Sequence, residues 1–466
     1  MIWSSLLSIL ACGGGVNTTT DSFTDSRETS VTDSTVEPIV YESAEMCGEC
    51  HTRQYEEWRT SMHAYAARSP VFDALAQKSF RDTSGEIGTF CTGCHSPFGT
   101  EEGEPGSTVA ADRSSLSLEG VSCDYCHSAV AHSGTVGNNN LVIDEYSGAQ
   151  GPYSADSNDS HLSEESEFIQ SPEFCGTCHD VFNFPGIRLE EAYTEYLVSP
   201  AAEEGVRCQD CHMGVTPGVA GQRPWGPSAA GATGDYPDRE QASHYFTGPD
   251  YSLIDAFPYP DDLEASAAEQ EASLQRSLTL LKNGAKISAL DIRQDPEHLR
   301  VNVAVVSLVN GHSIPTGFSS ERQMWVELIV SNSDGEIVFE SGTLDENSDL
   351  RDSHSAMVQD GTAILDEQLV NFQSRNLIRH GIQDELETEE TIFPTDANYI
   401  ERMGLRPNEE RVVSYTFQVE PDEALTVRAR LRFRNLPPYL LRALQLEDLV
   451  ERLHIFDISS KSTSWQ

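Results

Sequence analysis

One five-residue spelling, Cys-x-x-Cys-His, occurs five times in the first half of the chain and constrains the fold more than any other feature. The cysteines of the five copies are Cys47, Cys50, Cys91, Cys94, Cys123, Cys126, Cys175, Cys178, Cys208 and Cys211. The histidines that end them are His51, His95, His127, His179 and His212. Two thiols at this spacing reach the two vinyl groups of a porphyrin, and the adjacent imidazole lies under the iron. The sequence therefore predicts five covalently attached haems c, with these histidines as proximal iron ligands.

Two other chemistries also use paired cysteines. Zinc ribbons contain Cys-x-x-Cys pairs, but tetrahedral zinc does not require a histidine directly after every second cysteine. A disulfide framework does not require that histidine either. The chain has eleven cysteines, so the ten in the motifs leave one, Cys12.

Size and charge limit the classes of partner. At 466 residues the chain is long enough for two folded regions and a tail. Lys and Arg total 30 against 75 Asp and Glu, which gives a formal net charge of −45. Such a surface repels nucleic acid and anionic membranes. Two interpretations of the charge remain open: a well-solvated surface, and a docking surface for a basic redox partner.

The N-terminal segment has the features of an export signal. Residues 1–11 form an apolar run that is too short to span a bilayer, and Ile9-Leu10-Ala11-Cys12-Gly13 resembles the bacterial lipobox. A basic stretch before the run is missing, so an ordinary signal peptide and a stray thiol stay as alternatives to a lipid on Cys12. Residues 13–40 are rich in Ser, Thr and Asp and predict a disordered tether. We therefore expect an exported protein that is lipid-anchored in the bacterial envelope, periplasmic or at the cell surface, and that meets the membrane only through its lipid.

The rest of the chain divides by its periodicity. Residues 41–257 hold all five motifs and predict a loop-rich, partly helical domain, with loops at 134–160 and 214–238. The expected helices are one that starts after His51 and runs until Pro70 at most, one over 189–198, and one over 262–281 within a connecting segment, 258–284.

From residue 285 to residue 466 the hydrophobic period changes to two, which is typical of half-buried antiparallel strands. Strands are expected over 413–419 and 425–433, a hairpin over 324–339 with its turn at Asp334-Gly335, and a short helix over 439–446. The expected fold class is thus mixed: a multihaem domain followed by an all-β, sandwich-like domain.

The first motif and the residues after it resemble the cytochrome c554-type multihaem family. The residues that carry this resemblance are Tyr55, Trp58, Ser61, His63 and Ala64 after the first motif, and the sequences around Cys123, Cys175 and Cys208. The resemblance covers roughly residues 45–250 and implies electron-transfer haems. The small founding members carry four haems, so the spatial order of five cannot be taken from them. Residues 300–435 resemble a second module, Gly-His-x-x-Pro-Thr-Gly, which follows multihaem domains in bacterial cytochromes. It is carried here by Asn310 to His312, Pro315 to Gly317, Glu321-Arg322 and Trp325.

The ligand on the far side of each iron decides between an electron carrier and an enzyme. Fourteen histidines minus the five proximal ones leave nine candidates. The c554 resemblance implies distal ligands at His63, His161 and His244. His63 is too close to His51 in sequence to bind the same iron, so a neighbouring haem is its expected target. The rigid Pro-Thr-Gly frame favours His312 as a ligand lent by the β-domain, and His132 is the fifth candidate. Trp58 is expected either on a porphyrin face or in the core.

These features predict an outward-facing electron carrier with mostly bis-histidine haems, which connects a membrane donor to an external or periplasmic acceptor. A reductase of small nitrogen or sulfur oxyanions at one open haem is the alternative, although the Cys-x-x-Cys-Lys site of pentahaem nitrite reductases is absent. An enzymatic role therefore stays uncertain. A third possibility is a haem-filament subunit in which the sandwich docks a partner.

Overall fold

The computed structural model describes residues 41–144, 146–153, 161–183, 186–229, 237–294, 298–381, 387–419 and 424–466. Residues 41–466 form one compact unit. The predicted lipid site Cys12 and the predicted tether lie outside the described residues, as do parts of the loops expected over 134–160 and 214–238.

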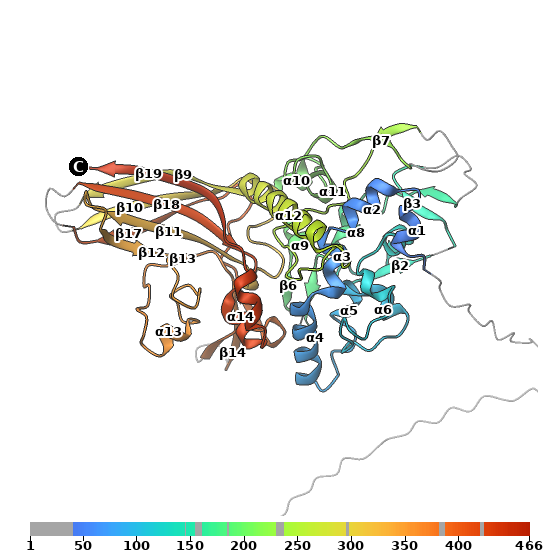
Figure 1. The fold of residues 1–466 in the computed structure, drawn as a ribbon, viewed down its shortest axis with the longest axis horizontal. Helices are drawn as coiled ribbons and strands as arrows, with labels where there is room; N and C mark the ends of the chain where they lie inside the picture. Colours follow the sequence, from blue (N-terminus) through green and yellow to red (C-terminus); the bar gives the residue numbers. More distant parts are fainter. Residues whose placement is uncertain are drawn as a thin grey trace, which may run out of the picture. The chain divides into compact units, whose positions relative to one another are not determined.

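The motif-bearing region is built from short helices and two-stranded ladders (Figure 1). Its helices are α1 (Ala44–Gly48), α2 (Thr52–Trp58), α3 (Met62–Tyr65), α4 (Pro70–Asp82), α5 (Thr92–His95), α6 (Pro97–Glu101), α7 (Cys123–His127), α8 (Pro172–Gly176), α9 (Ala192–Leu197), α10 (Pro200–Glu203) and α11 (Cys208–His212). Its strands are β1 (Ala129–His132), β2 (Leu141–Ile143), β3 (Ala149–Gly151), β4 (Ser163–Glu165), β5 (Val181–Phe182), β6 (Arg188–Glu190), β7 (Trp225–Pro227) and β8 (Asp238–Glu240). They pair as β1–β2, β3–β4, β5–β6 and β7–β8.

Two predicted helices differ in detail from the observed ones. The stretch after His51 is two helices, because Ser61 starts a new one by accepting a hydrogen bond from the amide of Ala64. The helix expected over 189–198 begins only at Ala192, since Leu189 lies in strand β6 and is buried against Val181. Tertiary burial therefore overrides the local helical pattern at Leu189.

A long helix, α12 (Leu263–Gly284), follows the motif-bearing region and confirms the helix expected over 262–281. Asp262 caps it by accepting a hydrogen bond from the amide of Ala265 at 3.0 Å. No helix among the described residues has the length and apolar composition that crossing a bilayer requires.

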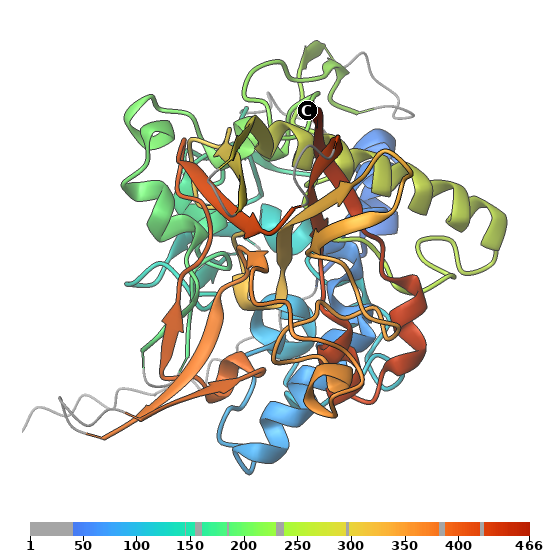
Figure 2. The ribbon, with the colours of Figure 1, turned by 90° about the vertical axis from the view of Figure 1, so that its left-hand side faces the viewer.

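The C-terminal region is β-rich, as predicted (Figure 2). Its strands are β9 (Ala285–Gln294), β10 (Leu299–Ser307), β11 (Gln323–Ser331), β12 (Ile337–Ser341), β13 (Val370–Asn371), β14 (Arg375–His380), β15 (Glu387–Thr391), β16 (Tyr399–Glu401), β17 (Glu410–Phe417), β18 (Leu425–Arg434) and β19 (Phe456–Trp465). The helices α13 (Ala356–Gln359) and α14 (Pro438–Ala443) lie between them, and α14 confirms the short helix expected near 439. One sheet has the order β17-β10-β9, a second β12-β11-β18-β19 with β13 beside β11, and a third β15-β14-β16. The predicted hairpin is the antiparallel pair β11–β12.

The first two sheets enclose one hydrophobic core. Alternate residues of β10, β11 and β18 point into it, and Val303, Leu328 and Leu431 have no exposed surface. Val71, Tyr251 and Leu253 of the motif-bearing region belong to the same core. Arg322 also donates two hydrogen bonds to the carboxylate of Asp250, at 2.8 and 2.9 Å. The strand-rich region is therefore packed directly onto the region that carries the motifs.

Candidate metal centres

All five motifs open into one cavity of about 1880 Å³. It is lined by every cysteine and every histidine of the motifs, and by His63, His161, His244 and His312. Pockets for a single small ligand measure roughly 300–1,000 Å³, so this cavity has room for several large cofactors. We number the five sites by the order of their motifs in the chain: site 1 at His51, site 2 at His95, site 3 at His127, site 4 at His179 and site 5 at His212.

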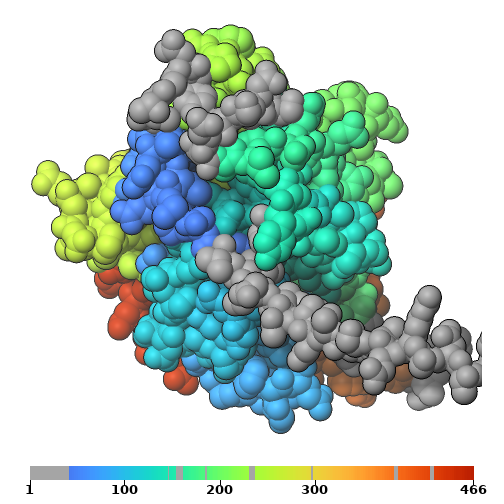
Figure 3. Space-filling model, turned by 90° about the vertical axis from the view of Figure 1, so that its right-hand side faces the viewer, coloured from blue at the N-terminus to red at the C-terminus, as the bar shows by residue number. Residues whose placement is uncertain are grey.

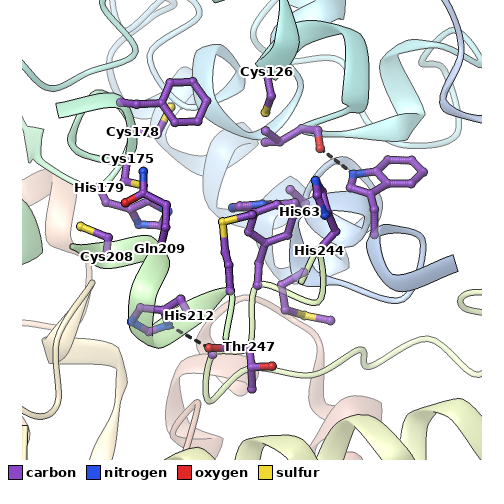
Figure 4. A pocket seen from close by; sticks show the side chains of 18 of the residues that line it. His63, Cys126, Cys175, Cys178, His179, Cys208, Gln209, His212, His244 and Thr247 are labelled. Atoms are coloured by element: carbon purple, nitrogen blue, oxygen red, sulfur yellow. Dashed lines mark hydrogen bonds between the residues drawn. The ribbon is translucent and has the colours of Figure 1, made fainter. Parts of the chain in front are cut away.

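Four motif histidines face a second histidine across the cavity. The distances between ring centres are 6.1 Å for His51 and His161, 6.4 Å for His127 and His244, 6.3 Å for His179 and His63, and 6.2 Å for His212 and His312. Two imidazoles that bind one metal ion from opposite sides, each at about 2.0 Å, have ring centres roughly 6 Å apart. The four pairs have the spacing of an axially ligated metal. Figure 4 shows His63, His179, His212 and His244 pointing into the same space from separate elements.

Hydrogen bonds turn these rings so that Nε2 faces the cavity. At four proximal histidines Nδ1 lies near an oxygen: the Ser228 carbonyl for His51 (2.8 Å), Gln150 for His127 (2.6 Å), Thr247 for His212 (2.9 Å) and the Glu190 carboxylate for His179 (3.0 Å). Three distal candidates use the carbonyl of a nearby residue in the same way: Leu162 for His161, Ala242 for His244 and Ser313 for His312. An Nδ1–H donated to such an oxygen fixes the tautomer and leaves Nε2 as the metal-binding nitrogen.

Burial keeps most of these imidazoles neutral, the form that binds a metal ion. It lowers the pKa of His63 and of His244 to about 3, and that of His212 to about 4. Burial also lowers the pKa of His179, but the adjacent carboxylate of Glu190 outweighs it and raises this pKa to about 9. A carboxylate partner makes the imidazole a stronger electron donor to a bound metal.

Site 2 differs from the other four. Burial lowers the pKa of His95 to about 4, so this imidazole is also neutral and suited to bind iron. Its ring lies stacked on Phe72, with ring centres 4.2 Å apart, and no second imidazole faces it within the described ranges. Phe72 and its neighbours on α4 contribute apolar side chains to the cavity there. Site 2 thus has a proximal histidine and no distal one from the described residues.

His132 is not placed opposite any motif histidine. It ends strand β1, its ring centre lies 6.1 Å from that of Phe168, and it is not among the described residues that line the cavity. The structure therefore brings together four of the five distal candidates and leaves His132 outside the cavity. His354 and His454 lie against Tyr439 and Phe456, at 4.4 and 4.6 Å between ring centres.

Contacts between motifs give the spatial order of the sites. Three pairs of thiols lie close enough to shift each other's pKa: Cys47 with Cys123, Cys94 with Cys178, and Cys175 with Cys208. Site 1 is therefore next to site 3, site 4 is next to site 2, and site 4 is next to site 5. The ring of Phe246 lies next to both His63 and His244, at 4.4 and 5.5 Å between ring centres, and so connects site 4 to site 3. The sites form a branched series, 1–3–4, with sites 2 and 5 both adjoining site 4.

Glycines in two motifs make room for an aromatic ring. A Cβ on Gly48 would lie 2.6 Å from the ring of Tyr55, and one on Gly176 would lie 2.4 Å from the ring of Tyr193. The backbone between the two cysteines is therefore pressed against a tyrosine at sites 1 and 4. Larger residues at these positions would displace the ring.

The arrangement does not resemble zinc or disulfide chemistry. None of the ten motif cysteines forms a disulfide. Across the described part of the chain, no group of three or more His, Cys, Asp or Glu side chains is arranged to hold a metal ion by itself. The motif histidines instead line the cavity, and the side chain of His179 keeps 54% of its surface accessible.

Sequence reasoning missed several supporting residues. Glu190 orients His179, the buried Glu57 accepts a hydrogen bond from the backbone amide of His244 at 2.7 Å, and Phe246 lies 4.4 Å from His63 between ring centres. None of them has a fixed spacing from a motif, so only the folded chain identifies them. Trp58 lies in the core, with Nε1 donating to the Val121 carbonyl at 2.8 Å, and it also lines the cavity.

Comparisons with known proteins agree with this chemistry. Residues 46–128 match the family model described as cytochrome c554 and c-prime. No curated protein matches the chain. Among solved structures, a penta-heme cytochrome c552 from Thermochromatium tepidum is similar in fold, with a TM-score of 0.58 and 19% sequence identity over 92% of this chain and 100% of that one. The family match over residues 46–128 and the Cys-x-x-Cys-His motifs gathered around one cavity are what a multihaem c-type cytochrome would show, and the solved structure shares the fold.

Proposed function

We propose that the chain carries five haems c, one per motif, and transfers single electrons along them. The observation that supports this most is the set of four imidazole pairs with ring centres 6.1 to 6.4 Å apart across one cavity. When bound, haem iron changes between its ferric and ferrous forms by one electron, and two imidazoles leave it no open coordination position. Sites 1, 3, 4 and 5 therefore suit electron transfer rather than substrate binding.

The chain itself holds the histidine ligands in position. The loop with His312 is anchored to the motif-bearing region, because the amide of Ser313 donates to Glu195 at 2.9 Å and the amide of Ala201 donates to the Asn310 carbonyl at 3.2 Å. These bonds fix the distal ligand of site 5 relative to its proximal ligand, His212. At sites 3 and 5, burial lowers the pKa of both histidines of the pair, so protons compete little for these imidazoles at neutral pH.

The first experiment is a count of cofactors and of ligand states. Mass spectrometry of the denatured protein should show five haems attached by thioether bonds. Electron paramagnetic resonance of the oxidised protein should show low-spin signals from four haems and a high-spin signal from one. Haem that is lost on acid–acetone extraction would contradict covalent attachment, and a mostly high-spin protein would contradict the four axial pairs.

A second function is favoured by site 2 alone. We propose that this site, which has His95 on one side and no described imidazole on the other, binds a small ligand and supports reduction of a nitrogen or sulfur oxyanion. Turnover assays with nitrite, hydroxylamine and tetrathionate test this proposal. If the protein exchanges electrons with a soluble cytochrome but turns over none of these substrates, the result supports the carrier function and contradicts the reductase function.

Export and anchoring are proposals that rest on the sequence. The lipobox-like residues around Cys12 support a lipid anchor that holds the protein at the envelope, where redox partner proteins would donate and accept electrons. An intact-mass spectrum of native protein should show a chain that starts at a lipidated Cys12. An unmodified Met1 in that spectrum would contradict the proposal.

A further inference from the structure

The cavity reaches the molecular surface mainly at site 1. Most of the exposed side chains that line it are there, on the segment before α1 and α1 itself and on the segments around β3 and β4. We call five of them the site 1 mouth: Glu42, Met46, Tyr146, Tyr153 and Leu162. Figure 3 shows this face, with the dark blue residues of α1 and α2 opposite blue-green residues near β2 and β3. By contrast, the lining residues around sites 2, 4 and 5 are buried or half-buried except for His179 and Leu308.

The centre of the mouth is apolar and aromatic. Met46 is 56% exposed, Tyr146 73%, Tyr153 41% and Leu162 70%. Single exposed apolar residues are common on protein surfaces, whereas a group of them at the opening of a functional cavity marks a place where another molecule binds. His51 and His161 line the same cavity, and Nδ1 of His161 lies 3.0 Å from the carbonyl oxygen of Leu162 in the mouth.

Carboxylates surround this apolar centre. Glu42, Glu45 and Glu49 are all exposed on or next to α1, and no lysine or arginine is part of that helix. A nearby cation, Arg239, lies over the ring of Tyr153 at 4.7 Å. The mouth therefore has the acidic rim and apolar centre that complement a basic protein.

We propose that the site 1 mouth is the docking surface for a small soluble redox protein whose cofactor edge is surrounded by lysines and arginines. The inference rests on the proposed electron-transfer function, and it names the class of partner and the site through which electrons leave the protein. In the transfer itself, one electron moves from the reduced iron at site 1 to the oxidised metal of the partner. No bond forms or breaks, and no proton moves.

Charge excludes the two other candidates for this surface. A second copy of the chain carries the same net charge of −45 and would be repelled. Residues 1–40 hold five carboxylates and a single arginine, so they do not complement an acidic rim either. A basic partner gains from long-range attraction during encounter, and salt weakens that attraction.

The test is stopped-flow electron transfer from the fully reduced holoprotein to an oxidised lysine-rich c-type cytochrome, measured over a series of ionic strengths. The wild-type rate constant should fall at least tenfold between about 10 mM and 500 mM salt, where the Debye length shortens from about 30 Å to a few ångström. The variant Glu42→Gln/Glu45→Gln should react at least threefold more slowly at low salt and match the wild type at high salt. The matched control Glu346→Gln/Glu367→Gln removes two exposed carboxylates from the strand-rich region and should leave the rate unchanged.

The reversed variant Glu42→Lys/Glu45→Lys provides a gain of function. It should speed electron transfer to an acidic redox protein that reacts slowly with the wild type. Equal rates for the mouth and control variants, a rate independent of salt, or self-association of the holoprotein through this face would overturn the inference. If the reduced protein reacts with ferricyanide and shows none of these charge effects, that result contradicts the docking proposal and leaves the carrier function intact. Failure of the reduced protein to transfer electrons to any acceptor would contradict the carrier function itself.

Discussion

Replacing His312 by alanine should open one haem and leave the other sites as they are. His312 faces His212 with ring centres 6.2 Å apart, and it is the one distal candidate in the cavity that comes from the strand-rich region. Its loop is held by hydrogen bonds from Ala201 to Asn310 and from Ser313 to Glu195, neither of which involves the imidazole. The variant His312→Ala should therefore keep its backbone in place and lose only the ligand.

The size of the effect follows from the ligand count. Four of the five sites have an imidazole pair, so the low-spin fraction should be about four-fifths in the wild type and about three-fifths in the variant. Electron paramagnetic resonance of the oxidised proteins measures this fraction. Carbon monoxide binding to the reduced proteins gives an independent count, which should rise from about one to about two molecules per chain.

His132 offers a matched control, because its ring lies against Phe168 rather than against a motif histidine. The variant His132→Ala should retain the wild-type spin state and carbon monoxide stoichiometry. Identical spectra for His312→Ala and the wild type would refute the assignment of site 5. A spectral change in His132→Ala of the same size would refute the choice of these four pairs.

Three further predictions concern the fold and the remaining sites. Cys91→Ser/Cys94→Ser should yield a chain with one haem fewer by mass spectrometry. The carbon monoxide site of the wild type should be lost with that haem. Loss of a low-spin haem in this variant would mean that the open site is not site 2. Burial raises the pKa of Glu321 from 4.5 to about 7, which favours its neutral form, so the stability that it contributes is complete below pH 4.5 and falls by up to about 3 kcal/mol as pH rises through 7. Glu321→Gln should flatten this fall between pH 5 and pH 8 in guanidinium unfolding of the holoprotein, and an unchanged slope would contradict it. Leu328→Ala, in the fully buried sheet core, should cost about 2–5 kcal/mol in the same assay, whereas Val412→Ala at a 59% exposed position should cost little.

Much of the fold was predictable because its signals are local. The period-two pattern found β17, β18 and the β11–β12 hairpin, and an acidic N-cap with a leucine-rich end found α12. The helix expected over 189–198 was partly wrong, since Leu189 is needed in the core between β5 and the segment near Ile400. A local propensity carries no information about a partner that lies two hundred residues away.

The candidate site also has features that the local sequence predicts and features that only the folded chain shows. Its chemistry was evident from the sequence, because a covalent haem needs thiols and imidazole at a fixed spacing. The short separation of His63 from His51 already predicted that His63 faces a different site, but it did not predict that this site is the one at His179. The hydrogen-bond partner Glu190 and the missing partner of His95 are likewise properties of the folded chain.

The loop that brings His312 to site 5 also has a consequence for how the protein matures. Under the proposed five-haem assignment, thioether bonds at Cys208 and Cys211 could form before the last third of the chain has folded, whereas His312, the proposed second ligand, would arrive only when that part docks. The optical spectrum of this one haem would then report on assembly, because it would change from that of a haem with one histidine ligand to that of a haem with two when the strand-rich region docks.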